Sequence, residues 1–258
     1  MNEKRHLSLV LVIMSSSEHE PQPQPHDPVD DSSLKFFPER RPSSGHTNSY
    51  IYRLFTRDSV NKIKCEGNVK EVMETSPLVK LMVSALNSSG CPINVRRHIS
   101  CESCNRGVTG GYDPVLNQVV ICYNRCRGTN MIQAVLGHEL LHAWDSCRAN
   151  LDFNNLDHVA CTEIRAANLF HCSIISGFLA GSVSLTNLGK AHQRCVKQKA
   201  LQSIMVVRPD LNVREADAVI ERVFGRCYND LEPIGRRVRR ASMDRERAYR
   251  ERYFYGYD

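Results

Sequence analysis

The sequence has little that would make it a membrane-spanning or a nucleic-acid-binding protein. It contains no run of about 20 apolar residues, so we expect no helix of this chain to cross a bilayer. The net charge is only +6, and no recognisable nucleic-acid-reading module accompanies the basic residues, so nucleic-acid binding is the weaker interpretation. At 258 residues and 41% hydrophobic content, the chain can bury one core of ordinary domain size.

The first residues also lack the marks of common targeting signals. A short apolar stretch at 7–14 follows two basic residues, but no small-x-small cleavage site comes after it. The segment is not the Arg-rich, acid-poor helix of a mitochondrial matrix presequence. Four prolines between residues 21 and 28 then predict an extended linker. We therefore predict a disordered leader at 1–49, a folded domain at 50–230 and a basic tail at 231–258.

The tail from Pro233 to Asp258 carries most of the excess charge. Eight arginines stand against four acidic residues, a balance of +4, and five aromatic residues are interspersed. Blocks of charge are commonly disordered, so a solvated tail is one interpretation. The other is peripheral contact with an anionic membrane surface, where each basic residue contributes about 1 kcal/mol and aromatic rings lie at the interface.

The most informative stretch holds a His-Glu-x-x-His pattern formed by His138, Glu139 and His142. Apolar residues recur at helical spacing through it and just before it: Met131, Ile132, Val135, Leu136 and Leu140. On a helix, the two histidines lie one turn apart on one face and can both ligate Zn²⁺. Glu139 can then act as general base on a water at the metal. The alternative is two surface histidines on an amphipathic helix.

A catalytic zinc needs a third protein ligand and an open position. Glu163 is our first choice, because it lies 21 residues after His142 on a second predicted helix. Asp145 competes, since i+7 returns to the face of His138, but it stands about 10 Å along the helix axis from that residue. It would then orient a ligating histidine instead. His158 is a weaker candidate.

The remaining pattern predicts an α+β fold of the zincin-like metalloprotease type, with a small antiparallel sheet and several helices. Strands are expected at 92–98, 110–112 and 119–122, the last two joined by a turn near residue 117. A C-terminal helical hairpin is expected, with one arm at 188–206 and another that starts at Asn212.

These residues resemble a known family. The runs Gly137–Asp145 (GHELLHAWD) and Ala160–Leu169 (ACTEIRAANL), with cysteine-bearing strands before them and a cysteine-bearing hairpin after them, resemble the mitochondrial inner-membrane proteases that mature an ATP synthase subunit precursor. The resemblance extends from about Cys65 to Asp230. One departure follows Asn168-Leu169, where that family usually has a small polar run ending in Gly-Asp-Cys and this sequence has Phe170–Phe178 (FHCSIISGF). This difference bears on packing behind the second helix and leaves the metal ligands in place.

The resemblance implies a zinc-dependent endopeptidase at the inner membrane, peripheral and on the intermembrane-space side. It also implies a chaperone-like role in assembling the membrane sector of the synthase. The alternative function is a non-catalytic assembly chaperone or adaptor, including a partner of the DNA-repair protein Ku, since some relatives are named for binding it. Mechanistically we expect Glu139 to move the proton, and Tyr112 or His158 could assist as a hydrogen-bond donor.

Eleven cysteines are many for a reducing compartment and suggest five pairs with one left over. The spacing Cys101-x-x-Cys104 and Cys122-x-x-x-Cys126 also suits a four-cysteine zinc site. The cysteine total and the family resemblance favour disulfides. Connectivity is not readable from sequence, although Cys195 and Cys227 could form a staple across the hairpin.

Overall fold

The computed structural model describes residues 11–12, 57–105, 107–149, 151–173, 188–239 and 242–258. Its helices are α3 (Arg57–Thr75), α4 (Pro77–Ser88), α5 (Val95–His98), α6 (Thr129–Arg148), α7 (Leu156–Ala166), the π-helix η2 (Ala167–His171), α9 (Leu188–Val207), α10 (Val213–Asn229), α11 (Asp244–Glu251) and the 3₁₀ turn η4 (Arg252–Tyr255). Its strands are β1 (Leu11–Val12), β2 (Ile99–Glu102), β3 (Gly110–Asp113) and β4 (Gln118–Cys122), in the order β1-β3-β4-β2. The predicted α+β class is confirmed. The predicted leader lies outside the described residues except for β1.

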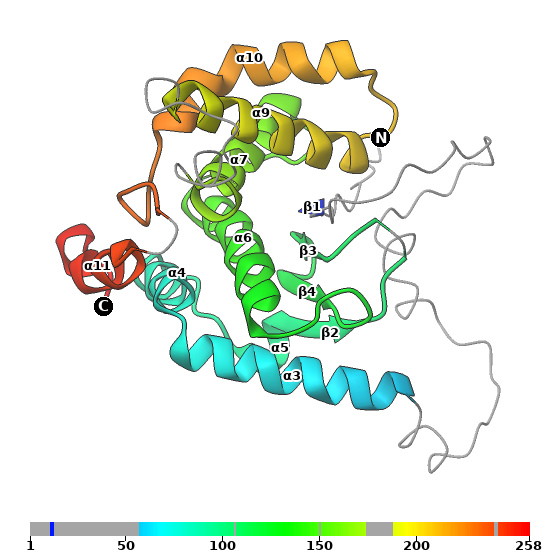
Figure 1. The fold of residues 1–258 in the computed structure, drawn as a ribbon, viewed down its shortest axis with the longest axis vertical. Coiled ribbons are helices and arrows are strands. Elements are labelled where there is room, and N and C mark those ends of the chain that lie inside the picture. The colour runs from blue at the N-terminus through cyan, green and yellow to red at the C-terminus, as the bar shows by residue number, and fades with distance from the viewer. Residues whose placement is uncertain (1–10, 13–56, 106, 150, 174–187, 240–241) are drawn as a thin grey trace, which may run out of the picture.

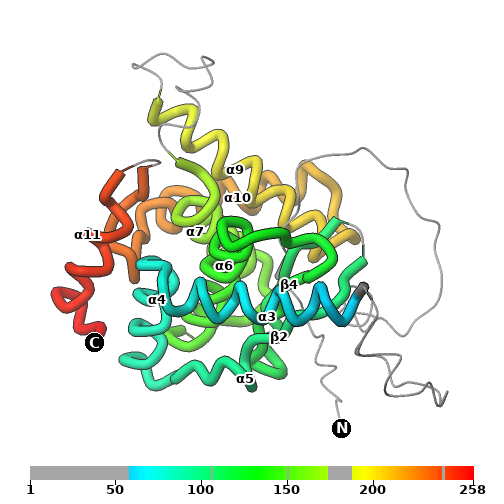
Figure 2. The backbone as a smooth tube through the Cα atoms, turned by 60° about the horizontal axis from the view of Figure 1, so that its bottom comes forward, coloured from blue at the N-terminus to red at the C-terminus, as the bar shows by residue number. Residues whose placement is uncertain are grey.

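Helix α6 runs through the middle of the molecule (Figure 1). It contacts β3 and β4 on one side, α3 and α4 on another, and α7 with η2 on a third. Helices α9 and α10 lie side by side and pack on α7 (Figure 2). A helix enclosed in this way must be apolar around most of its circumference, and twelve consecutive or near-consecutive residues between Ile132 and Asp145 are buried.

Local sequence sets several boundaries as expected. Helix α4 starts with Pro77 after Ser76, whose side chain accepts a hydrogen bond from the Val79 amide. Helix α10 starts after Asn212, and Glu215 completes the capping box. The predicted hairpin of helices is also confirmed, because α10 follows α9 along the chain and the two pack against each other.

Two expectations about the sheet were wrong in detail. Residues 92–98 are not a strand: Asn94 caps the single turn α5 by accepting a hydrogen bond from the Arg96 amide, and β2 begins only at Ile99. The sheet is mixed instead of antiparallel, because β2 pairs with β4 in parallel. The segment between them, which contains β3, is long enough to bring the chain back in the same direction. Only β3 and β4 form the expected hairpin, around Asn117 with a φ of 49°.

The cysteines form disulfides, as the favoured interpretation predicted. The five bridges are Cys65–Cys101, Cys91–Cys147, Cys104–Cys122, Cys161–Cys227 and Cys172–Cys195. The cysteine left over is Cys126, which is buried and donates its thiol hydrogen to the carbonyl of Thr109. The four-cysteine zinc site is excluded, because Cys101 is bridged to Cys65 and Cys104 is bridged to Cys122.

The disulfide considered between Cys195 and Cys227 does not form, because each of these cysteines is bridged to another partner. Helix α10 packs on α7, so Cys227 faces Cys161, and α9 packs on η2, so Cys195 faces Cys172. The two arms of the hairpin therefore present their cysteines to different neighbours. Both bridges fasten the segment that carries Glu163 to the hairpin.

The C-terminal segment is folded against the rest of the protein over its described residues. Helix α11 packs on α4, and the Tyr257 ring meets Trp144 of α6 edge-on, with centroids 6.4 Å apart. The solvated-tail interpretation therefore does not describe residues 242–258, although the division into domains remains a prediction. Within the described part of the chain, no helix is both long and apolar enough to cross a membrane.

We expect the double substitution Cys161→Ala and Cys227→Ala to lower the free energy of unfolding by about 2–5 kcal/mol. The bridge closes a loop with a sequence separation of 66, and its loss restores chain entropy to the unfolded state. Urea denaturation of the oxidised protein measures this. The control is Cys126→Ala, which removes a free thiol and should cost about 1 kcal/mol. Equal losses for the two proteins would contradict the assignment of this bridge.

Candidate active site

The two histidines of the motif meet at one point. They are one turn apart on α6 and at most 1% exposed, and their Nε2 atoms are 2.8 Å apart. The imidazole planes cross at 83° with ring centroids 4.5 Å apart. Because both Nε2 atoms point at the same small volume, the two imidazoles are placed to bind one metal ion between them.

Helix α7 brings Glu163 to the same volume. Its Oε2 lies 3.6 Å from Nε2 of His138 and its Oε1 lies 3.6 Å from Nε2 of His142. The residue is 1% exposed. Glu163, our first choice for the third metal ligand, therefore lies beside both imidazoles. The three groups form the donor set of two nitrogens and one carboxylate that protein zinc sites use.

Two buried carboxylates at this point have no hydrogen-bond partner. Among the described residues, neither oxygen of Glu139 nor of Glu163 is bonded, although both side chains are buried. An unpaired buried carboxylate is costly and normally accompanies a cation. Donor atoms about 2.0–2.2 Å from a tetrahedral zinc lie about 3.3 Å from each other, close to the separations here. The residues present therefore fit a metal ion.

Burial shifts the pKa of each of these groups toward the neutral form. It raises the pKa of Glu163 to about 8, although the nearby Ser203 hydroxyl acts in the opposite direction, and it raises that of Glu139 well above its usual range, helped by the neighbouring Glu163. It lowers the pKa of His142 to about 3, with a further contribution from Arg165, and lowers that of His138 well below its usual value. Neutral imidazoles are the form that binds metals. A cation within about 4–6 Å would restore the ionised carboxylates.

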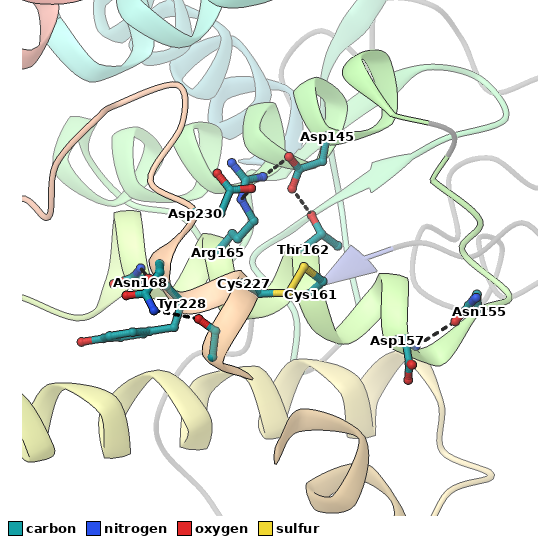
Figure 3. Close-up of a disulfide and its surroundings, with 12 residues drawn as sticks. Asp145, Asn155, Asp157, Cys161, Thr162, Arg165, Asn168, Cys227, Tyr228 and Asp230 are labelled. Carbon is teal, nitrogen blue, oxygen red and sulfur yellow. Dashed lines mark hydrogen bonds and ion pairs between the residues drawn. A yellow bond between two sulfur atoms is a disulfide. The ribbon is translucent and has the colours of Figure 1, made fainter. Parts of the chain in front are cut away.

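A chain of hydrogen bonds fixes the orientation of His142 (Figure 3 shows its outer part). Thr162 donates its hydroxyl hydrogen to Asp145 Oδ2 at 2.8 Å, so its oxygen must accept from His142 Nδ1, also at 2.8 Å. Arg165 donates a hydrogen bond to the other oxygen of this carboxylate, Asp145 Oδ1. The proton of His142 is therefore on Nδ1, and its Nε2 lone pair faces the shared volume.

The other predicted candidates lie elsewhere. Asp145 accepts hydrogen bonds from Thr162 and Arg165 and is linked to His142 through Thr162, in the place expected of a group that orients a histidine. His158 accepts a hydrogen bond from the Asp152 amide in the loop before α7. The Tyr112 hydroxyl donates to Asn117 in the strand turn, 3.0 Å away. Neither His158 nor Tyr112 lines the volume between the ligand candidates.

The sequence departure after residue 169 lies directly behind the site. The Phe170 ring covers Gly137, where an added Cβ would come 2.3 Å from Cε1 of the ring. His171 Nε2 lies 2.7 Å from Nδ1 of His138 and so orients that imidazole from behind. Sequence reasoning gave His171 no role. The π-turn that carries it shifts the register of side chains by one residue, and such turns are frequent at functional sites.

A small cavity of about 20 Å³ opens beside the metal-ligand candidates. Its lining comes from α6, α7, η2 and α9: His138, Glu163, Ala167, His171, Lys199, Gln202 and Ser203. Strand β3 passes on the other side of the motif, where a Cβ at Gly110 would lie 3.5 Å from Glu139 Oε1 and 2.4 Å from Val135 Cγ1. The base candidate therefore lies between the strand and the metal position, with no room for a side chain at 110.

This arrangement defines a class. A buried His-Glu-x-x-His helix packed on a small sheet, with a glutamate returned by the next helix, is that of a zincin-like peptidase domain. The chain belongs to the peptidase M76 family, which matches residues 63–235.

Curated relatives agree with this assignment. The chain is 38% identical over 206 residues to the human protein named "Mitochondrial inner membrane protease ATP23 homolog". The aligned residues cover 79% of this chain and 80% of that protein. It is 40% identical over 224 residues to the protein of the same name from Danio rerio, with 86% and 84% covered. The Schizosaccharomyces pombe "Mitochondrial inner membrane protease atp23" is 34% identical over 177 residues, with 68% and 94% covered. No solved structure matches the chain.

We expect Thr162→Val to weaken binding of Zn²⁺ by about 10- to 100-fold, because the isosteric side chain leaves His142 free to rotate and change tautomer. Competition with a chelating dye measures the affinity. Thr162→Ser keeps the hydroxyl and serves as the control, with affinity close to that of the original protein. Unchanged affinity in the valine variant would show that the Thr162 contact does not orient the imidazole.

Proposed function

We propose that the protein is a zinc-dependent endopeptidase in which His138, His142 and Glu163 hold the metal and Glu139 is the general base. The observation that carries this proposal is the convergence of two imidazole lone pairs and a buried, unpartnered carboxylate, with atoms within 3.6 Å of one another. A second unpartnered carboxylate, that of Glu139, adjoins them. A merely structural site has no use for that fourth group.

The chain's own residues divide the work of peptide hydrolysis. Zinc bound at this site would polarise the scissile carbonyl and make water a stronger nucleophile. Glu139 takes the proton of the attacking water and delivers it to the leaving amine nitrogen, so one carboxylate serves as base and then as acid. Thr162 and His171 keep the two imidazoles in the tautomer that offers Nε2. Burial of the whole cluster strengthens each electrostatic interaction.

The proposed location is the inner mitochondrial membrane, on the intermembrane-space side and peripheral. Support comes from the names of the relatives and from five disulfides, which persist in oxidising compartments. The proposed substrate is an ATP synthase subunit precursor, which rests on the family resemblance alone. The protein would also aid assembly of the synthase membrane sector, a role that needs the fold but not Glu139.

A peripheral membrane contact is supported by the C-terminal segment. Tyr253, Phe254 and Tyr255 form one 3₁₀ turn and are 59%, 87% and 45% exposed. Helix α11, directly before them, carries Arg245, Arg247 and Arg250. Aromatic rings beside several cations match an interface of anionic headgroups, where both kinds of side chain are stabilised.

We expect Glu139→Gln to lower peptidase activity by about 10²- to 10⁴-fold while one zinc per chain remains bound, because the base is lost and the ligands are kept. Glu163→Ala should lose both zinc and activity. Metal analysis of the purified variants beside a fluorogenic peptide assay measures this. Asp113→Asn is the control for a buried carboxylate elsewhere in the fold, where it accepts hydrogen bonds from the Val115 and Leu116 amides, and it should keep bound zinc. Full activity of Glu139→Gln would contradict the enzyme and favour the assembly role.

We expect the double substitution Phe254→Ser and Tyr253→Ser to weaken binding to vesicles of phosphatidylcholine with cardiolipin by about tenfold or more, since burying an aromatic side chain is worth about 1.5–3 kcal/mol. Flotation measures the bound fraction. Val115→Ser with Leu116→Ser removes two apolar side chains that are 59% and 58% exposed in the strand turn, and should leave binding unchanged. Equal loss in both proteins would argue against a C-terminal membrane contact.

A further inference from the structure

Helix α9 forms a wall of the metal cavity opposite the ligand candidates. Lys199, Gln202 and Ser203 line the same space of about 20 Å³ as His138 and Glu163. A cavity of this size holds about one water molecule, so the groups around it can reach a single oxygen atom. Helix α9 is held in place because it packs on α7 and η2 and is joined to residue 172 by a disulfide.

Among the described residues that line this cavity, Lys199 is the one that carries a positive charge. Within the described part of the chain no carboxylate lies within ion-pair distance of its ammonium group, whereas Lys197 on the same helix is paired with Glu221. The side chain is half-buried.

The other walls of the site are acidic. Glu139 and Glu163 each contribute a buried carboxylate without a hydrogen-bond partner among the described residues. Peptide hydrolysis places a full negative charge on the scissile carbonyl oxygen when water adds to the carbonyl carbon, and two neighbouring carboxylates disfavour that charge. A cation placed beside the oxygen stabilises the transition state more than the neutral substrate, and this difference accelerates the reaction.

From this geometry we infer that Lys199 is a further catalytic residue, which donates a hydrogen bond to the scissile carbonyl oxygen as that oxygen becomes negatively charged, with the Gln202 amide beside it as a second donor. The inference rests on the proposed peptidase function and adds to it the group that stabilises the oxyanion. Tyr112 and His158, the donors considered from sequence, are both engaged away from the cavity.

The test compares Lys199→Met with Lys199→Arg and with Lys197→Met. Lys197→Met is the matched control, because it removes a lysine of the same helix that does not line the cavity. We expect Lys199→Met to lower kcat by about 10²- to 10³-fold with KM little changed, as for loss of an oxyanion donor. Arginine keeps the charge and should restore most of kcat. Zinc content and thermal stability should be equal in all four proteins.

A second readout is independent of turnover. A phosphinic peptide with the sequence of the cleaved test peptide mimics the tetrahedral intermediate, and calorimetry measures its binding to each zinc-loaded protein. We expect Lys199→Met to weaken this binding by about the factor by which it lowers kcat, and Lys197→Met to leave it unchanged.

The outcomes separate this inference from the proposed function. If the original protein cleaves the peptide and Lys199→Met matches it in kcat and in phosphinic-peptide affinity, the role of Lys199 is overturned while the peptidase stands. The same holds if Lys199→Met changes only KM, or if Lys197→Met loses as much. If the original protein neither cleaves the peptide nor binds the analogue, the proposed function itself is wrong and the inference is overturned with it.

Discussion

The packing of α7 on α6 is the constraint on which the rest of the site depends. It pushes the carboxylate of Glu163 into a buried space that already holds two imidazoles, at 3.6 Å from each Nε2 atom. That arrangement is unfavourable for an isolated carboxylate, which is why burial raises its pKa to about 8. A metal ion would turn the same contacts into stabilising ones, so metal binding and the stability of this fold are coupled.

Covalent bridges hold the helices that would otherwise be free to relax away from that contact. Cys161–Cys227 ties α7 to α10, and Cys172–Cys195 ties the end of η2 to α9. Glu163, His171 and Lys199 are thus held together through the hairpin of α9 and α10. Helix α6 also contacts the C-terminal segment through Trp144 and Tyr257, so this helix touches both the segment of the proposed membrane surface and the candidate metal site.

Much of the local architecture was predictable. The spacing of His138 and His142 on an apolar-periodic segment, the capping box at Asn212 and the start of α4 after Ser76 all depend on residues within a few positions of one another. Such features require no knowledge of the distant chain. The strand expected at 92–98 failed because a single cap at Asn94 outweighed the β propensity of a short segment.

The sequence by itself determined the helix that carries two candidate metal-binding histidines, the general-base candidate between them and the oxidised state expected of its many cysteines. Only the tertiary structure decided which cysteines meet, that β2 joins the sheet in parallel, and that His171 and Lys199 face the metal cavity. The physical reason is that helical periodicity relates residues within about one or two turns. Contacts between α7, η2 and α9 depend on crossing geometry, and the π-turn at η2 breaks the very periodicity from which a side chain's direction is read.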